Sequence, residues 1–190
     1  MRLFVGIELD EDVKAAVGRV ADRLRTNLRR AGAEVDARWV DSANLHLTLW
    51  FIGEVADERA GRIQDVLRPQ FATPVFEVTV DGLGAFPRSG PPRVFWLNIA
   101  RGAESLGRLY GEVRDRLLGL GFEEEKRPYS PHLTIARVKG IRRGSPRVRE
   151  ELGALAAACG ASRVGAVTLF RSRLSPKGSQ YEPLLRVPLS

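Results

Sequence analysis

The sequence predicts a fold of mixed α-helices and β-strands whose order repeats in two halves. Apolar residues recur at helical spacing in some segments and alternate with polar residues in others. Each half then shows the order strand, helix, strand, helix, strand, with extra strands added. The 190 residues, 44% of them apolar, suit one globular domain built of two small, tightly packed lobes.

The elements of the first half follow from apolar patterning and from signals at helix ends. Asp10, Glu11 and Asp12 favour a helix start because they complement the positive end of the helix dipole, and Gly32 favours its end. The strands show a short apolar run or alternation of polar and apolar residues. The expected elements are strand 3–9, helix 10–30, strands 35–40 and 45–52, helix 57–67 and strand 76–80.

Residues 81–93 are expected to form a long loop, because they contain three glycines and three prolines. The segment lies near the middle of the chain, so we expect two pseudo-symmetric lobes of about residues 1–90 and 91–190, with possible exchange of strands. The second half repeats the patterns of the first. Its expected elements are strand 94–99, helix 106–120, strand 132–138, helix 148–159 and strands 165–174 and 181–189.

The composition excludes several kinds of protein. A single cysteine, Cys159, excludes an intramolecular disulfide and a cysteine-based zinc site. No apolar run approaches the roughly 18 residues of a membrane-spanning helix, and the N-terminal apolar stretch soon meets acidic residues, unlike a signal peptide. We therefore expect a cytoplasmic protein without a membrane partner, and a monomer as the simplest state.

The formal net charge of +7 favours polyanionic partners. Nucleic acid or a phosphorylated ligand fits this balance. An arginine excess also arises from genome base composition, and only four of the 30 basic residues are lysines. The charge alone does not separate these explanations.

The only two histidines, His46 and His132, each begin the same pattern of residues. Residues 46–49 read histidine, leucine, threonine, leucine, and residues 132–135 read histidine, leucine, threonine, isoleucine. From composition, the chance that both histidines begin such a pattern is roughly 4 × 10⁻⁵. Each copy lies on the corresponding predicted strand of its half, so the match indicates a shared role.

Strand geometry gives this pattern a physical meaning. Side chains alternate between the two faces of a strand, so His46 and Thr48 share one face while the aliphatic residues anchor the other. The same holds for His132 and Thr134. In a duplicated fold with a two-fold relation, both pairs would meet in one cleft.

Two imidazoles and two hydroxyls around one centre suit acid–base chemistry on a phosphate. One ring accepts a proton from water, the other donates one to the leaving oxygen, and the hydroxyls bond the non-bridging oxygens. A 2′,3′-cyclic phosphate fits this set because its alkoxide leaving group needs a proton. Two histidines held by hydrogen bonds in the core are one alternative. A catalytic metal is another, although two histidines without a carboxylate at ligand spacing are too few for a closed zinc site.

The chain resembles the two-histidine phosphoesterase superfamily, whose signature is a pair of histidine-x-threonine-x motifs. It is most similar to the RNA 2′,3′-cyclic phosphodiesterases, also called the 2′-5′ RNA ligase family. The likeness extends over about residues 2–185 and is weakest over 139–149. Its most specific segments are residues 2–7, 44–55, 84–87, 92–96, 131–137 and 172–181.

This resemblance implies a bilobal α+β fold of duplicated units, with antiparallel sheets facing across a central cleft. It implies metal-independent hydrolysis of RNA 2′,3′-cyclic phosphate ends, or of a cyclic nucleotide, to 2′-phosphomonoesters, without a cofactor. His46 would then donate the proton to the leaving 3′ oxygen and His132 would accept one from water. The sequence alone leaves the reverse assignment open.

Three further residues are candidates for substrate binding. Arg137 and Phe51 each lie five residues after a histidine, so on a straight strand they would face away from it, whereas a bulge would bring them back. Arg137 would contact phosphate, and Phe51 would stack on a base or pack. Tyr129 precedes the second motif and would line the cleft. A basic cluster would follow an RNA backbone or form a solvated face: Arg127, Lys139, Arg142, Arg143, Arg147 and Arg149.

Two other functions remain open. The resemblance also implies reversal of the chemistry, in which a 2′-5′ RNA ligase joins tRNA halves. A binding module of a different class would hold RNA or phosphate in the same cleft without turnover.

Overall fold

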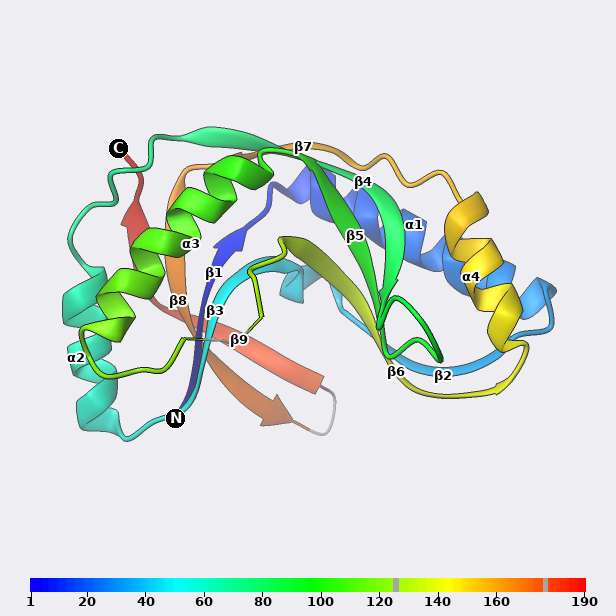
Figure 1. Cartoon of the computed structure of the whole chain (residues 1–190), viewed down its shortest axis with the longest axis horizontal. Helices are drawn as coiled ribbons and strands as arrows, with labels where there is room; N and C mark the ends of the chain where they lie inside the picture. The colour runs from blue at the N-terminus through cyan, green and yellow to red at the C-terminus, as the bar shows by residue number, and fades with distance from the viewer. Residues whose placement is uncertain (125–126, 176–177) are drawn as a thin grey trace.

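Strands dominate the computed structural model, which describes residues 1–124, 127–175 and 178–190 (Figure 1). Pro176 and Lys177, which belong to the last segment of the family resemblance, lie outside the described residues. The elements are β1 (Arg2–Glu8), α1 (Glu11–Arg30), β2 (Glu34–Trp39), the 3₁₀-helix η1 (Ser42–Asn44), β3 (His46–Glu54), α2 (Asp57–Leu67), β4 (Phe76–Phe86), β5 (Val94–Arg101), α3 (Ala103–Leu118), β6 (His132–Arg143), α4 (Ser145–Ala154), β7 (Gly160–Val164), β8 (Ala166–Ser175) and β9 (Gly178–Pro188).

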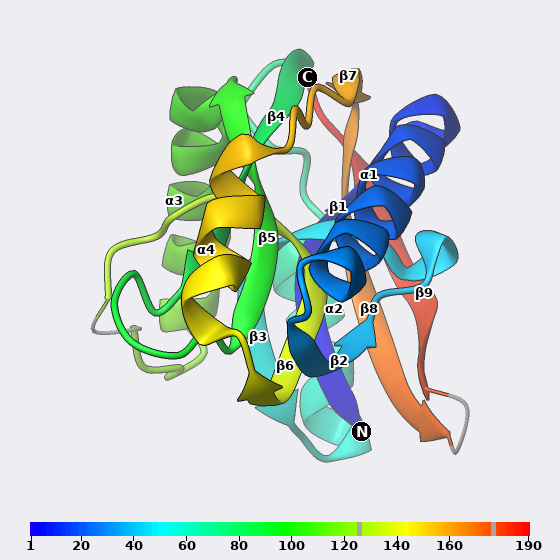
Figure 2. The ribbon, with the colours of Figure 1, turned by 90° about the vertical axis from the view of Figure 1, so that its right-hand side faces the viewer.

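The strands form two sheets in which every pairing is antiparallel. One sheet has the strand order β3-β1-β8-β9, and the other has the order β2-β6-β5-β4-β7. The expected α+β class with antiparallel sheets is thereby confirmed (Figure 2). Each sheet takes strands from both halves of the sequence.

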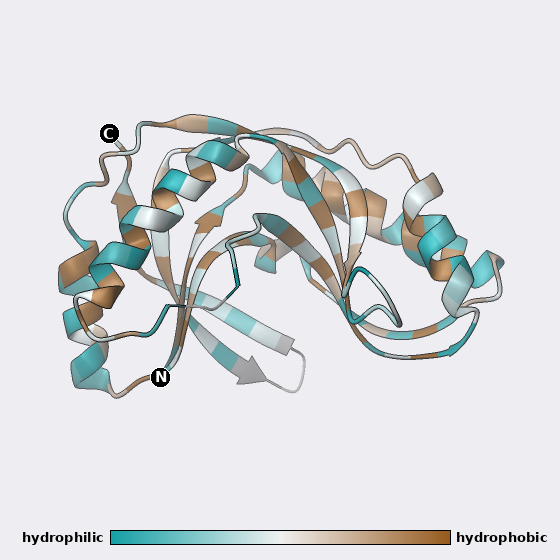
Figure 3. Ribbon diagram, in the orientation of Figure 1, coloured by the Kyte–Doolittle hydropathy of each residue, from teal (hydrophilic) through white to brown (hydrophobic). Residues whose placement is uncertain are grey.

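Two helices, α1 and α3, pack on the sheet that does not contain their preceding strand. Helix α1 follows β1 of the first sheet but contacts β2 and β7 of the second, whereas α3 follows β5 of the second sheet but contacts β3 of the first. Valines and leucines at the predicted helical spacing are the buried residues of α1. Figure 3 shows hydrophobic and hydrophilic residues alternating along the elements, as layered packing requires. Among the described residues, no helix has the length and apolar character needed to cross a membrane.

The predicted loop at residues 81–93 is wrong in its first half. Strand β4 continues to Phe86, past the glycines that signalled a turn. Gly82 has φ of +88°, and the pairing with β5 shifts register between Val80 and Leu83. A glycine in the left-handed region lets the strand bulge without ending, so this turn signal marks a bend within a strand.

The predicted helix at residues 148–159 is also wrong at its end. Helix α4 spans Ser145–Ala154, and the strand β7 that follows was not predicted. The backbone N–H of Cys159 donates to the carbonyl of Val80, which attaches this segment to β4. Pairing with a sheet edge outweighs the helix propensity of an alanine-rich sequence.

Candidate active site

The two histidine motifs lie on strands β3 and β6, which come from different sheets. Strand β3 is the edge of its sheet, β6 lies inside the other, and the two strands contact each other. Contact between these strands brings the two halves of the sequence together.

The two motif strands share one pattern of burial and one bulge. In both copies the histidine and threonine are half-buried, the aliphatic residues beside them are buried, and the fifth residue after the histidine is exposed. Each strand has an extra residue three positions after its histidine, Leu49 in β3 and Ile135 in β6. A bulge reverses the alternation, so Phe51 and Arg137 return to the face of the histidine.

Each imidazole is held by the same backbone contact. The Nδ1 atom of His46 lies 2.8 Å from the carbonyl oxygen of Asn44, and that of His132 lies 2.8 Å from the carbonyl oxygen of Ser130. A carbonyl only accepts, so Nδ1 carries the hydrogen in both rings. The Nε2 atom of each ring is therefore the one left for proton transfer.

Aromatic rings hold both imidazoles in edge-to-face contact. The ring centre of His46 lies 5.1 Å from that of Tyr181 at an interplanar angle of 87°. His132 has the same 5.1 Å and 87° relation to Phe86. Such pairs fix ring orientation, which limits where each Nε2 atom can act.

A cavity of about 640 Å³ receives residues of both motifs. Four of the predicted site residues line it: Thr48, Phe51, Tyr129 and His132. Its lining also contains the arginines Arg93 and Arg127, which makes it suitable for an anion.

His46 reaches this cavity through Thr48, because its Nε2 atom lies 3.0 Å from the Thr48 hydroxyl. The hydroxyl donates to the neutral ring, since the other ring nitrogen carries the hydrogen. His46, Thr134 and Arg137 are not among the lining residues of the cavity.

The charge of Arg137 connects the second motif to the first histidine. Burial lowers the pKa of His46 below its usual 6.5, and the nearby positive charge of Arg137 lowers it further. The hydrogen bond to Asn44 opposes both effects. The guanidinium of β6 therefore acts electrostatically on the imidazole of β3, as expected for groups that share one cleft.

Tyr129 lines the cavity and contacts the first motif. Its ring stacks on Tyr110 with centres 4.4 Å apart, and its hydroxyl donates to the Thr48 carbonyl at 3.3 Å. Burial raises the pKa of the Tyr129 phenol. Tyr129 thus lies in the cavity lining, as expected. Its hydrogen bond joins the segment before the second motif to the first motif.

The basic cluster divides between the cavity and structural contacts. Arg127 lines the cavity, and Arg143 pairs with Glu34 at 3.7 Å. Arg147 and Arg149 donate to backbone carbonyls of distant segments. The last two hold loops together, which is a structural use of the cluster.

Sequence reasoning missed two glycines that make room for the rings. A Cβ on Gly84 would lie 2.3 Å from the Trp96 ring, whose centre lies 6.4 Å from that of His132. A Cβ on Gly6 would lie 3.4 Å from the His46 ring and 2.9 Å from the Leu47 carbonyl. Gly6 faces a strand distant in sequence and Gly84 faces the next strand along the chain, so only the pairing reveals their role.

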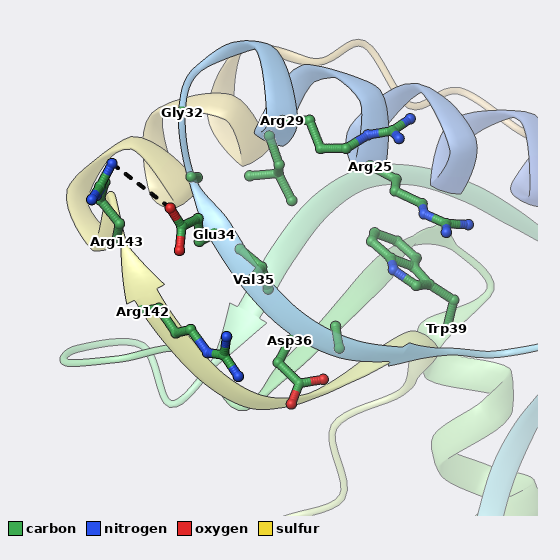
Figure 4. Close-up of a pocket in the computed structure, with 12 residues that line it drawn as sticks. Arg25, Arg29, Gly32, Glu34, Val35, Asp36, Trp39, Arg142 and Arg143 are labelled. Carbon is green, nitrogen blue, oxygen red and sulfur yellow. Dashed lines mark ion pairs between the residues drawn. The ribbon is translucent and has the colours of Figure 1, made fainter.

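A second hollow, of about 700 Å³, lies between α1 and β2 (Figure 4). Arginines and Trp39 line it, but none of the predicted catalytic residues does. Within the described ranges, no three histidine, cysteine or carboxylate side chains gather as a metal site would require. The cavity near the motifs, in contrast, combines imidazole, hydroxyl and guanidinium groups.

Two strands that each carry a histidine and a threonine toward one cavity are characteristic of two-histidine phosphoesterases. A family model of the 2′-5′ RNA ligase superfamily matches residues 8–175, and the chain belongs to this superfamily. An RNA 2′,3′-cyclic phosphodiesterase of Aeropyrum pernix is 38% identical over 173 residues, which cover 90% of this chain and 95% of the relative. One of Methanothermobacter thermautotrophicus is 34% identical over 187 residues, 95% of each chain.

Solved structures show the same fold. A crystal structure of a Thermus thermophilus protein, TT0787, has a TM-score of 0.76 and 28% identity, covering 100% of this chain and 98% of the other. A structure of E. coli LigT complexed with 3′-AMP has a TM-score of 0.75 and 25% identity, with the same coverage.

Proposed function

We propose that this protein hydrolyses RNA 2′,3′-cyclic phosphate ends to 2′-phosphomonoesters by metal-independent acid–base catalysis. The observation that carries the proposal is the shared cavity, lined by Thr48 of the first motif and His132 of the second. Relatives that match almost the whole chain bear the name of this activity. The match over nearly the full length makes the same reaction the natural assignment.

The two imidazoles take the two proton transfers. The Nε2 atom of His132 accepts a proton from water as the water oxygen bonds to phosphorus. The bond from phosphorus to the 3′ oxygen breaks, and His46 gives its Nε2 proton to that oxygen. The products are a 2′-phosphate and a free 3′ hydroxyl.

The lowered pKa of His46 is compatible with the donor role. Burial and Arg137 lower the pKa of His46, which makes the protonated ring a stronger acid toward the leaving alkoxide. The negative charge of a bound phosphate favours the protonated ring, so substrate binding would itself promote protonation of His46.

The neighbouring side chains bind the rest of the substrate. Thr48 and Thr134 donate hydrogen bonds to the non-bridging oxygens, and Arg137 neutralises their charge. Phe51, 52% exposed at the cavity, offers its ring to a base.

Single substitutions test the proposal. On an oligonucleotide with a 2′,3′-cyclic phosphate end, His46→Ala and His132→Ala should each abolish formation of the 2′-phosphate. Thr48→Ala and Thr134→Ala should each lower kcat by about 10²-fold, as the loss of one transition-state donor does. Circular dichroism and thermal melting check that the variants fold. Turnover near the wild-type rate in either histidine variant would refute the mechanism.

Removal of metal ions should leave turnover intact, because imidazoles perform both proton transfers. The measurement is the rate of 2′-phosphate formation before and after dialysis against EDTA. Loss of activity that a divalent cation restores would contradict the proposal. The same assay on tRNA halves separates hydrolysis from joining, and binding without any product would indicate the binding module instead.

A further inference from the structure

Two arginines lie side by side on the cleft face of neighbouring strands. Arg38 of β2 is the register partner of Arg137 of β6, and Arg137 is the partner of Val94 on β5. Register partners share one face of a sheet. Val94 lines the cavity, so both arginines lie on the face that carries the candidate active site.

The other face of β2 belongs to the helix layer. In Figure 4, Val35 and Trp39 point toward α1, and Asp36 points away from it. Burial alternates along β2 without interruption, and the Trp39 ring lies 6.1 Å from that of the fully buried Phe95. Alternation places Arg38 on the side of Asp36, away from α1.

Arg38 and Arg137 carry like charges at paired positions of neighbouring strands. Like charges at directly opposed positions of a sheet destabilise it. Within the part of the chain that the structure describes, no ion pair involves Arg38 or Arg137. Farther along the same two strands, Arg143 pairs with Glu34. An anion bound between Arg38 and Arg137 would attract both guanidiniums and offset their mutual repulsion.

We propose that Arg38 binds the phosphodiester that precedes the cyclic phosphate in an RNA chain. The inference rests on the proposed function, which places the cyclic phosphate near Arg137 and the histidines. Neighbouring strands are about 4.8 Å apart, so Arg38 on β2 lies one strand farther from the cavity than Arg137 on β6. This offset suits the phosphate that lies one nucleotide before the cyclic phosphate. Guanidinium groups match phosphate oxygens in a two-point contact. The preferred substrate is then an RNA end with an internal phosphodiester, rather than a cyclic mononucleotide.

Three substrates with 2′,3′-cyclic phosphate ends test this subsite. They are a mononucleotide, a dinucleotide with a natural phosphodiester, and the same dinucleotide with an uncharged methylphosphonate linkage. We expect the wild type to favour the natural dinucleotide over both others by about ten- to hundredfold in kcat/KM, the order of one charge-assisted contact. Arg38→Gln should bring both ratios close to one, and Arg38→Lys should restore part of them.

The matched control is Arg101→Gln, an exposed arginine at the far end of β5 from Val94, which should keep both ratios. Both ratios close to one in the wild type, or an equal loss of kcat/KM on all three substrates in Arg38→Gln, would overturn the proposal.

A binding measurement keeps this test independent of turnover. The probes are dinucleotides with a terminal 2′-phosphate, one with the natural linkage and one with the methylphosphonate. The natural linkage should bind about tenfold more tightly in the wild type and equally well in Arg38→Gln. If the protein shows this difference but no hydrolysis, the proposed function fails and the subsite stands. If hydrolysis occurs without this difference, the subsite fails alone.

Discussion

The two candidate catalytic histidines are anchored alike but have different surroundings. Both rings donate from Nδ1 to a backbone carbonyl at 2.8 Å. The Nε2 atom of His46 also accepts a hydrogen bond from the Thr48 hydroxyl. Burial and Arg137 lower the pKa of His46. No hydrogen bond joins His132 to Thr134 in the described segments. Different surroundings allow two copies of one motif to take opposite proton-transfer roles.

The lowered pKa of His46 makes a prediction about stability. The unfolded imidazole binds a proton near pH 6.5, while the folded ring binds it only at lower pH. As pH falls below 6.5, protonation therefore favours the unfolded chain, and the free energy of unfolding decreases.

Urea unfolding of the wild type and of His46→Gln, from pH 7.5 down to pH 5, measures this contribution. The stability of the wild type relative to the variant should fall across that range, since other groups titrate alike in both. A difference independent of pH would show that burial of His46 has no such effect.

At the scale of elements, the site depends on matched bulges in β3 and β6. Leu49 and Ile135 are the extra residues, and they return Phe51 and Arg137 to the histidine face. Two consecutive buried residues, Leu49–Trp50 and Ile135–Ala136, accompany each bulge. Both motifs therefore present three positions, at the histidine and two and five residues beyond it, toward the cleft.

Close packing of β4 against β5 supports the second motif, and Gly84→Ala tests it. The added methyl would meet the Trp96 ring at 2.3 Å, so the ring beside His132 must move. We expect the free energy of unfolding to drop by about 1–3 kcal/mol, as in overpacked cores, together with a loss in kcat/KM. Gly140→Ala in β6 is the control, because a Cβ there meets nothing within 4 Å. Wild-type stability and activity in Gly84→Ala would contradict this role.

Local patterns in the sequence predict the two motif strands, β3 and β6, and the shared faces of His46 with Thr48 and of His132 with Thr134. Apolar spacing likewise predicts α1 and its buried face. The sequence does not show which strands pair, because the register of β2 with β6 joins residues about a hundred positions apart. The role of Arg38 depends on this pairing and that of Gly84 on the register of β4 with β5, so both emerge only from the structure.

At the scale of the whole molecule, crossing connections hold the two sheets against each other. Helices α1 and α3 each contact the sheet to which their preceding strand does not belong. Strands β3 and β6 therefore meet between two mutually supported layers, and the cavity forms there. The net charge of +7 favours an anionic substrate in this cavity.

The central claim is that His46 and His132 act on opposite sides of one phosphorus atom, as donor and acceptor. The most direct test uses a 2′,3′-cyclic phosphate with sulfur in place of the 3′ oxygen, because a thiolate leaves without a proton. His46→Ala should regain turnover on this substrate to within about tenfold of the wild type, whereas His132→Ala should remain inactive. Rescue of His132→Ala, or no rescue of His46→Ala, would contradict the account.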